Sequence, residues 1–350
     1  MNFIASSLSD IGIKRMTNQD ALSVTVVDTD FGQVLFAIIC DGIGGLSKGE
    51  LASSTLVGAF NDWFENSFKD ILYKELNSKR LFKVLKKSWN SIIQLQNEKI
   101  KQYGLKHNIQ LGSTISLLLC FNNNYYVAHV GDTRIYLLSN DITQITKDQT
   151  LLQQEIDNNK GLSEEEIKNF PKKNVLLQCV GVGDVVPSFY MGSVTSNSSF
   201  LLCSDGFRNK VSDIEIFNAL NYDMLNDKQS MNSMLSQLTD TAKHRLEKDN
   251  ISSIVVKSIC NTTDTPISKR GKYLSVSIKT LMILLFLYIS IQMIVLSLNK
   301  STVFFSVAGV FIFLDFLLIL SITEDLSNKS ECIFKVEHSN MVINSSDTIE

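Results

Sequence analysis

The chain has 350 residues, which is enough for one large domain or two ordinary ones. Its formal net charge is −3, so nothing in the composition points to nucleic acid as a partner, and we expect none. The six cysteines are scattered without a C-x-x-C pair, which indicates small buried side chains in a reducing compartment. The N-terminus lacks the basic and apolar segments of a signal peptide, so we expect residues 1–260 to be cytoplasmic.

Short apolar runs bounded by Gly, Asn or Asp predict the strands of the N-terminal part. They cover residues 21–28, 34–40, 115–121, 125–130, 134–138, 200–203 and 252–257. The sequence N-N-N at 122–124 is typical of a hairpin turn between two of these strands. His129 lies inside a strand, and we expect it to be a packed core residue.

Long helices are predicted between the strands. Residues 49–103 contain no proline and repeat apolar residues at helical spacing, which predicts two long amphipathic helices. Residues 211–221 and 226–247 also have a helical pattern. Paired strands with helices inserted between them predict an α+β layered fold.

The composition changes after residue 270. Residues 280–298 carry no charge and residues 303–322 carry only Asp315, and each run reaches the roughly 20 apolar residues that span a bilayer. We therefore expect a transmembrane helix hairpin at 280–322, with a buried helical hairpin of a soluble protein as the alternative. The preceding linker, 261–279, contains lysines and an arginine, which favours its cytoplasmic side.

This organisation predicts a protein of the cytoplasmic membrane with two spans. Its N-terminal domain, 1–260, and its tail, 323–350, would both be cytoplasmic. The tail has six acidic residues, two lysines and a histidine, and we expect it to be mobile or weakly ordered. Asp315 is costly inside a bilayer; it is either protonated or paired with Gln292 or a partner helix, or else simply tolerated.

Five short segments place an aspartate beside a tight turn or at a strand end. They are R-M-T-N-Q-D (15–20), D-G-I-G-G (41–45), G-D-T-R (131–134), S-D-G (204–206) and D-N (249–250). An Asp-Gly pair alone is a common turn signal, so the order and spacing of the segments carry the argument. Mg²⁺ and Mn²⁺ prefer oxygen ligands and need few protein groups if these converge. The pattern therefore predicts a carboxylate site for divalent cations, which support phosphate chemistry.

The predicted strands explain how these aspartates could meet. Asp41 and Asp205 each follow an apolar strand, Asp132 lies in a turn between two strands, and Asp249 precedes a strand. Each of them has an alternative as an ordinary turn or cap residue. A guanidinium would be needed to hold a phosphate dianion with two hydrogen bonds, and Arg15 is the candidate. Its alternative is a surface ion pair.

Taken together, the segments resemble the metal-dependent type 2C protein Ser/Thr phosphatases, the PPM family, in their compact bacterial form. The resemblance runs from about residue 6 to 258. It rests on Arg15, Asn18, Gln19, Asp20, Asp41, Gly42, Gly44, Gly45, Gly112, Ser113, Thr114, Gly131, Asp132, Thr133, Arg134, Ser204, Asp205, Gly206, Asp249 and Asn250. It implies a four-layer α-β-β-α sandwich of two antiparallel sheets flanked by helix pairs.

The resemblance also implies a role for each matched residue. Asp41 would bridge two Mn²⁺ or Mg²⁺ ions, the Gly42 carbonyl would bind the second ion, and Asp20 would reach it through water. Asp205 and Asp249 would hold the first ion, and Asp132 with Asp205 would form a third, weaker site. Arg15 would bind the phosphate, which a metal-bridging hydroxide would attack in line.

Several positions depart from the family pattern. Ile43 stands where animal members carry a histidine, and Gln149 replaces the histidine of the usual T-x-D-H-S segment. Residues 171–181 match the family only loosely, and residues 149–180 should form a flap beside the site. We expect these changes to alter substrate preference rather than remove metal binding.

The predicted function is a membrane-anchored phosphatase for phosphoserine and phosphothreonine proteins, opposing a cognate Ser/Thr protein kinase. The main alternative is a catalytically weak phosphoprotein-binding signalling protein of the same fold, and the intact aspartate set argues against it. A third alternative is a phosphohydrolase for small phosphoesters, which the open site of the family disfavours by analogy.

Overall fold

The computed structural model describes residues 1–43, 48–159, 161–195, 197–259, 334–343 and 348–349. These residues belong to one compact unit. The predicted basic linker, 261–279, and the predicted transmembrane hairpin, 280–322, lie outside the described residues. Within the described ranges, no helix combines the length and the apolar character needed to cross a bilayer.

Two antiparallel sheets form the centre of this unit. The first has the order β1 (Asn2–Asp10), β10 (Ile251–Ile259), β9 (Ser199–Cys203), β6 (Arg134–Leu138) and β7 (Ile142–Gln144). The second has the order β11 (Phe334–Val342), β2 (Asp20–Thr29), β3 (Gly32–Asp41), β4 (Ile115–Phe121), β5 (Asn124–Val130) and β8 (Ser188–Ser193). The sandwich implied by the sequence is therefore confirmed.

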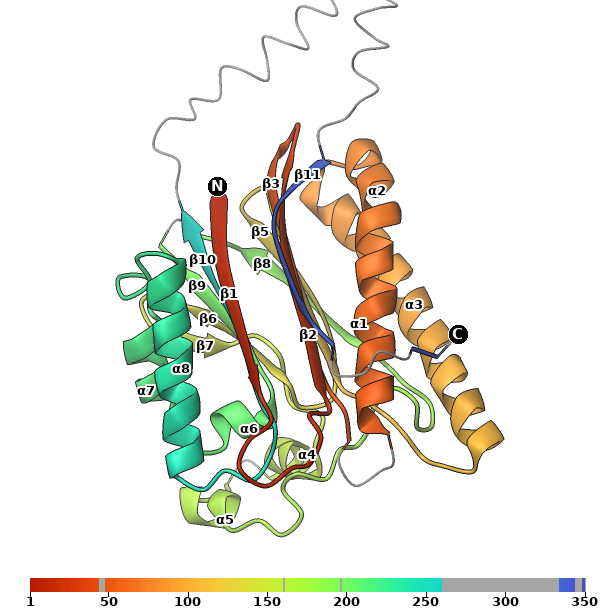
Figure 1. Cartoon of the computed structure of the whole chain (residues 1–350), viewed down its shortest axis with the longest axis vertical. Coiled ribbons are helices and arrows are strands. Elements are labelled where there is room, and N and C mark those ends of the chain that lie inside the picture. Colours follow the sequence, from red (N-terminus) through yellow and green to blue (C-terminus); the bar gives the residue numbers. More distant parts are fainter. Residues whose placement is uncertain (44–47, 160, 196, 260–333, 344–347, 350) are drawn as a thin grey trace, which may run out of the picture. The chain divides into compact units, whose positions relative to one another are not determined.

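Helices cover the outer face of each sheet (Figure 1). Helices α1 (Gly49–Asn66), α2 (Phe68–Lys74) and α3 (Ser78–His107) pack on the β2–β3–β4–β5 side. Helices α7 (Asp213–Leu220) and α8 (Lys228–His244) pack on the β1–β10–β9–β6 side. Short helices α4 (Leu151–Asn158), α5 (Glu164–Lys168) and α6 (Asp205–Arg208) lie at one end of the sandwich. Apolar side chains fill all three interfaces between the four layers.

The seven predicted strands all occur, within one or two residues of their predicted ends. Asn122 and Asn123 have φ of 49° and 61°, so the predicted hairpin turn is also confirmed. The sequence analysis missed β1, β7, β8 and β11. Strand β1 was missed because its sequence, N-F-I-A-S-S-L-S-D, has a weak apolar pattern. It is defined by its pairing with β10 over its whole length.

The predicted helices are confirmed, and the structure adds four short ones, α2, α4, α5 and α6. The region 49–103 contains a short third helix, α2, between the two long ones. Side-chain caps mark several helix starts: Asn77 accepts a hydrogen bond from the Arg80 amide, and Ser212 forms a capping box with Glu215.

His129 is a fully buried residue of β5, as expected. Its Nδ1 lies 2.8 Å from the Ser116 hydroxyl and its Nε2 lies 3.1 Å from the Lys147 carbonyl oxygen. The carbonyl can only accept, so Nε2 carries the proton and Nδ1 accepts from Ser116. Burial lowers the pKa of His129 to about 4, so the ring is neutral near pH 7 and serves packing. Cys40, Cys120, Cys179 and Cys203 are likewise buried free thiols.

The expectation of a weakly ordered tail is wrong for residues 334–342. These residues form β11, which pairs antiparallel with β2 from Phe334 opposite Thr29 to Val342 opposite Leu22. The Asn340 side chain donates to the Ser7 hydroxyl (2.6 Å), and the rings of Phe334 and Phe64 lie 5.7 Å apart. This strand could not be predicted from the composition of the tail, because the contacts that stabilise it come from β2, β1 and α1.

Strand β11 predicts that the tail stabilises the domain. We expect a chain ending at residue 333 to lose about 2 kcal/mol of stability, because Phe334, Ile343 and Ile349 leave a partly buried apolar surface. This loss corresponds to a Tm lower by roughly 4–8 °C for a domain of this size. Thermal unfolding of the full chain and the truncated chain measures the difference.

A chain ending at residue 343 is the matched control. It keeps β11 and loses Ile349, whose amide donates to the Thr55 hydroxyl at 3.1 Å, so its Tm should fall between those of the other two chains. Equal Tm values for the full chain and the chain ending at residue 333 would show that β11 adds nothing.

Candidate metal and phosphate site

The pairing of β2 with β3 places two of the predicted aspartates side by side. Asp20, the first residue of β2, is in register with Asp41, the last residue of β3. Gly42 follows in a crowded turn, where its amide donates to the Gln19 carbonyl oxygen at 3.1 Å. A Cβ atom at Gly42 would lie 2.4 Å from the Gly49 carbonyl oxygen, so only glycine fits there.

The G-S-T segment fixes the backbone of Asp41. The Asp41 amide donates to the Thr114 hydroxyl, and the Thr114 amide donates to the Asp41 carbonyl oxygen, both at 2.9 Å. The Ser113 hydroxyl donates to the same carbonyl oxygen at 3.0 Å. The end of β3 is therefore held from both sides.

Asp205 and Asp249 come from the other sheet. Asp205 begins α6, two residues after the last residue of β9, and Asp249 lies two residues before the first residue of β10. Strands β9 and β10 are antiparallel neighbours, so these two ends meet at the same end of the sheet. Gly206 allows the close approach, because a Cβ atom there would lie 2.1 Å from the Asn250 carbonyl oxygen.

Asn250 holds the segment that carries Arg15. Its Oδ1 accepts from the Gln19 amide at 2.9 Å, while its Nδ2 donates to the carbonyl oxygens of Ile11 (2.9 Å) and Thr17 (3.2 Å). The buried side chain thus joins the β1–β2 loop to the start of β10. The sequence analysis matched Asn250 to a motif but did not identify this role.

Arg15 forms an ion pair with Asp249, and its predicted role in binding phosphate stays a prediction. Its Nη2 donates to Asp249 Oδ2 at 2.6 Å, and both side chains are about one-third exposed. This hydrogen bond, together with the charges of Asp41 and Asp205, raises the pKa of Arg15. The guanidinium is therefore a fixed positive charge at the solvent-facing side of the site.

The carboxylates of the site disfavour one another's ionisation. Burial, followed by repulsion from Asp205 and Asp249, raises the pKa of Asp20 to about 7. Burial and the charges of Asp20, Asp205, Asp132 and Asp249 raise the pKa of Asp41 well above its usual range. Burial and the charges of Asp249 and Glu247 raise the pKa of Asp205, while the charge of Arg208 acts in the opposite direction. Such a cluster is destabilising unless positive charge offsets it.

The donor set fits two hard cations. It offers carboxylates from Asp20, Asp41, Asp205 and Asp249, together with the carbonyl group of Gly42. Within the described ranges, no three His, Cys, Asp or Glu side chains already stand together as a complete ligand set. Asp20 and Asp41 nevertheless lie opposite each other in register, and the charges of Asp205 and Asp249 act on both, so the four carboxylates form one cluster.

Asp132 occupies the β5–β6 turn next to this cluster. It follows Gly131, whose φ is 106°. Gln149 fixes that turn with two hydrogen bonds of 2.8 Å. Its side-chain Oε1 accepts from the Gly131 backbone amide, and its backbone amide donates to the Gly131 carbonyl oxygen. Gln149 therefore acts as a clamp on the turn that carries Asp132. Burial and repulsion from Asp205 raise the pKa of Asp132 to about 7.

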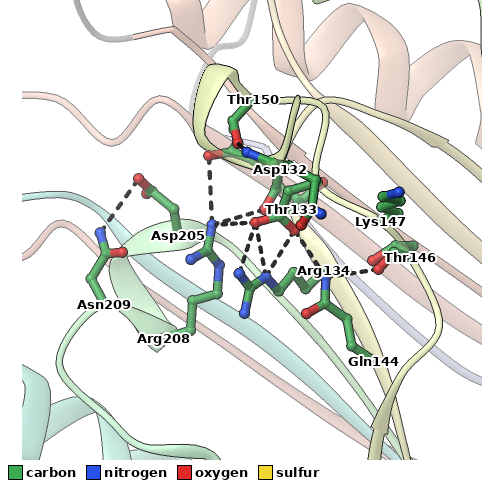
Figure 2. A network of polar contacts seen from close by, with 12 residues as sticks. Asp132, Thr133, Arg134, Gln144, Thr146, Lys147, Thr150, Asp205, Arg208 and Asn209 are labelled. Atoms are coloured by element: carbon green, nitrogen blue, oxygen red, sulfur yellow. Dashed lines mark hydrogen bonds and ion pairs between the residues drawn. The ribbon is translucent and has the colours of Figure 1, made fainter. Parts of the chain in front are cut away.

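Two arginines border Asp132 in a polar network (Figure 2). Arg134 binds Asp148 in a two-pronged manner, with Nε 2.8 Å from Oδ1 and Nη2 2.7 Å from Oδ2. Arg208, from α6, lies 3.6 Å from Asp132 Oδ2 and 3.5 Å from Asp148 Oδ2 through its Nη2. Neither Arg208 nor Asp148 was assigned a role from the sequence. The available signal for Arg208 was its position three residues after Asp205, a spacing at which helical side chains are neighbours.

The predicted flap contributes to the same region. A cavity of about 200 Å³ lies beside Asp132 and Arg208, and Thr150, Leu152, Ile167, Lys173 and Asn174 of the flap line it. The flap segment is therefore next to the acidic cluster, as expected.

Ile43 lies directly after Gly42, and its amide donates to the Gly112 carbonyl oxygen at 3.1 Å.

Comparisons with known proteins agree with this geometry. The family model described as "Protein phosphatase 2C" matches residues 13–251. The Mycobacterium tuberculosis serine/threonine protein phosphatase PstP is 29% identical over 214 residues, which is 61% of this chain and 38% of that protein. The Listeria innocua serine/threonine phosphatase stp is 27% identical over 222 residues, which is 63% of this chain and 83% of that protein.

Solved structures show the same fold. A serine/threonine phosphatase from S. agalactiae superposes with a TM-score of 0.61 and 27% identity, covering 73% of this chain and 99% of that one. The catalytic domain of PstP, solved in complex with two manganese ions, superposes with a TM-score of 0.57 and 23% identity, covering 74% of this chain and 99% of that one.

The role of Asn250 can be tested by substitution. We expect Asn250→Ala to cost about 2–3 kcal/mol, since it leaves three backbone groups of the β1–β2 loop without their partner. The same change should weaken Mn²⁺ binding, because this loop carries Asp20 and Arg15. Urea denaturation and calorimetric Mn²⁺ titration measure the two effects.

Asn221→Ala is the matched control, because Asn221 bonds to the Phe217 carbonyl oxygen at the end of α7, in a different part of the fold. It should reduce stability modestly and leave Mn²⁺ affinity unchanged. An Asn250→Ala protein that binds Mn²⁺ like the wild type would contradict the assigned role.

Proposed function

The chain belongs to the protein phosphatase 2C family, and we propose that it is a membrane-anchored, metal-dependent protein serine/threonine phosphatase. The observation that carries this proposal is the convergence of Asp20, Asp41, Asp205 and Asp249 from two sheets, with Arg15 beside them. The similarity to bacterial serine/threonine phosphatases supports it. Its substrates would be phosphoserine and phosphothreonine proteins, and its cellular opponent a Ser/Thr protein kinase.

Each residue of the site has a part in this activity. Two Mn²⁺ or Mg²⁺ ions, when bound, would supply an activated water and offset the charge of the phosphate. Asp41 would hold both ions, Asp205 and Asp249 the first, and Asp20 and the Gly42 carbonyl the second. Arg15 would orient the phosphate with two parallel hydrogen bonds. The side chain of Ile43 has no titratable group, so the departing serine or threonine oxygen would be protonated by water.

Asp41→Asn tests the metal assignment with two readouts. We expect turnover of a phosphothreonine peptide with Mn²⁺ to fall by at least about a thousandfold, since the group that holds both ions is lost. The variant should keep its fold, and without metal it should be at least as stable as the wild type, because one member of a repelling buried cluster has lost its charge. Addition of Mn²⁺ should raise the Tm of the wild type and not that of the variant.

Asp70→Asn is the control, because Asp70 is an exposed residue of α2 outside the site. It should retain turnover, which EDTA should abolish. Retained turnover in Asp41→Asn would refute the metal assignment. A wild-type chain that binds Mn²⁺ without hydrolysing the peptide would favour the alternative, a phosphoprotein-binding signalling protein.

We also propose that residues 280–322 anchor the protein in the cytoplasmic membrane. The uncharged run 280–298 and the nearly uncharged run 303–322 support this. The position of β11 is compatible with this anchor. Residues 259 and 334 belong to the same compact unit, so any crossings of a bilayer between them would have to be even in number. A two-helix hairpin satisfies this condition.

Cell fractionation tests the anchor. The full chain should stay in the membrane pellet after alkaline extraction, whereas a chain with residues 280–322 replaced by a short Gly-Ser linker should become soluble. The linker variant keeps β11 and should keep peptide turnover. Recovery of the full chain in the soluble fraction would refute the anchor and favour a helical hairpin buried in protein.

A further inference from the structure

Arg208 brings a positive charge to the place where the family resemblance implies a third cation. It is the last residue of α6, and Asp205 is the first. Its Nη2 lies 3.6 Å from Asp132 Oδ2 and 3.3 Å from the Asp132 carbonyl oxygen. Both side chains are largely buried, with 14% of Arg208 and 8% of Asp132 exposed. Figure 2 shows the guanidinium between Asp132 and Asp205.

The charge of Arg208 is available to Asp132 because Asp148 has another partner. Arg134 neutralises Asp148 through hydrogen bonds of 2.8 Å and 2.7 Å, whereas Arg208 reaches the same carboxylate only at 3.5 Å. The network of Asp132, Asp148, Arg134 and Arg208 therefore contains two carboxylates and two guanidiniums. Its formal charges cancel before any ion binds.

This balance disagrees with a third metal site at Asp132 and Asp205. A divalent ion between these carboxylates would lie within a few ångströms of the Arg208 guanidinium in a buried region, where like charges repel strongly. Arginine keeps its proton under all ordinary conditions, so the repulsion cannot be relieved by deprotonation. The ion could bind only if Arg208 moved away from Asp132.

We propose that Arg208 is a built-in cation that takes the place of the third metal ion. It compensates the charge of Asp132, and the site therefore holds two ions. The two ions at Asp20, Asp41, Asp205 and Asp249 are part of the proposed function, on which this inference rests. The inference concerns the number of Mn²⁺ ions that the protein binds and how this number depends on residue 208. Both can be measured without an activity assay.

Titration of the purified full-length chain with Mn²⁺ tests the proposal, by calorimetry and by the electron paramagnetic resonance signal of free Mn²⁺. The wild type should bind two ions, with no third ion into the millimolar range. Arg208→Gln should bind a third ion, tighter than in the wild type by roughly 10–100-fold, which is the usual effect of a group next to metal ligands. Arg208→Lys keeps the charge and should bind two.

Two further variants separate the charge effect from a general change of structure. Arg245→Gln removes a guanidinium that pairs with Glu215 on the surface, and it should leave the Mn²⁺ isotherm unchanged. Adding Asp132→Asn to Arg208→Gln should abolish the third site, because one of its two carboxylates is gone. Circular dichroism of each variant verifies the fold.

Two outcomes would overturn the proposal. One is a third Mn²⁺ bound by the wild type below the millimolar range, and this measurement stands even if Arg208→Gln fails to fold. The other is a folded Arg208→Gln protein that still binds only two ions. Absence of all Mn²⁺ binding in the wild type would instead count against the proposed function.

Discussion

The repulsion among carboxylates at one end of the sandwich is the constraint on which the rest of this structure depends. Asp20 is buried, Asp41 and Asp205 are half-buried, and desolvation together with neighbouring negative charges raises the pKa of each. A fold left to itself would separate such groups. Here both sheets hold them in place by backbone pairing, so the free energy that assembles the site comes from the hydrophobic core between and around the sheets. Cations are the natural complement to such a cluster.

Polar residues around the site hold the strand ends in place against the repulsion between the aspartates. Thr114 and Ser113 fix Asp41, Asn250 fixes the loop before Asp20, and Gln149 fixes the turn before Asp132. Register is equally important: Asp20 faces Asp41 only in the observed pairing of β2 with β3, and a slip of one residue would send their side chains to opposite faces. The two arginines also differ in solvent exposure. Arg15 is partly exposed and suited to a substrate, whereas Arg208 is buried and suited to a permanent ion pair.

Much of this arrangement could be predicted from the sequence, and the exceptions have a common cause. Strands such as β3 and β4 carry their own signal, because continuous apolar residues bounded by turns have few other uses. The aspartates were found because each follows or precedes such a strand. Strands β1 and β11 were missed because their residues are stabilised by partners far away in the sequence, as β propensity depends on context. Arg208 and Gln149 were missed or undervalued for the same reason, since their importance lies in contacts with Asp132 and Gly131.

Strand β11 links the far end of the sequence to the catalytic end of the sheet. Without β11, the outer side of β2 would be an unpaired edge, and exposed edges favour association with other chains. Its register ends with Val342 opposite Leu22, two residues from Asp20, so the tail braces the strand that delivers this carboxylate. The residues that follow reach α1, where the Ile349 amide bonds to Thr55. Helix α1 begins at Gly49, and the Gly49 carbonyl oxygen lies close to Gly42, which follows Asp41. Helix α1 therefore contacts both Ile349 of the tail and the turn after Asp41. Residues 334–343 are therefore a structural part of the domain that carries the candidate metal site.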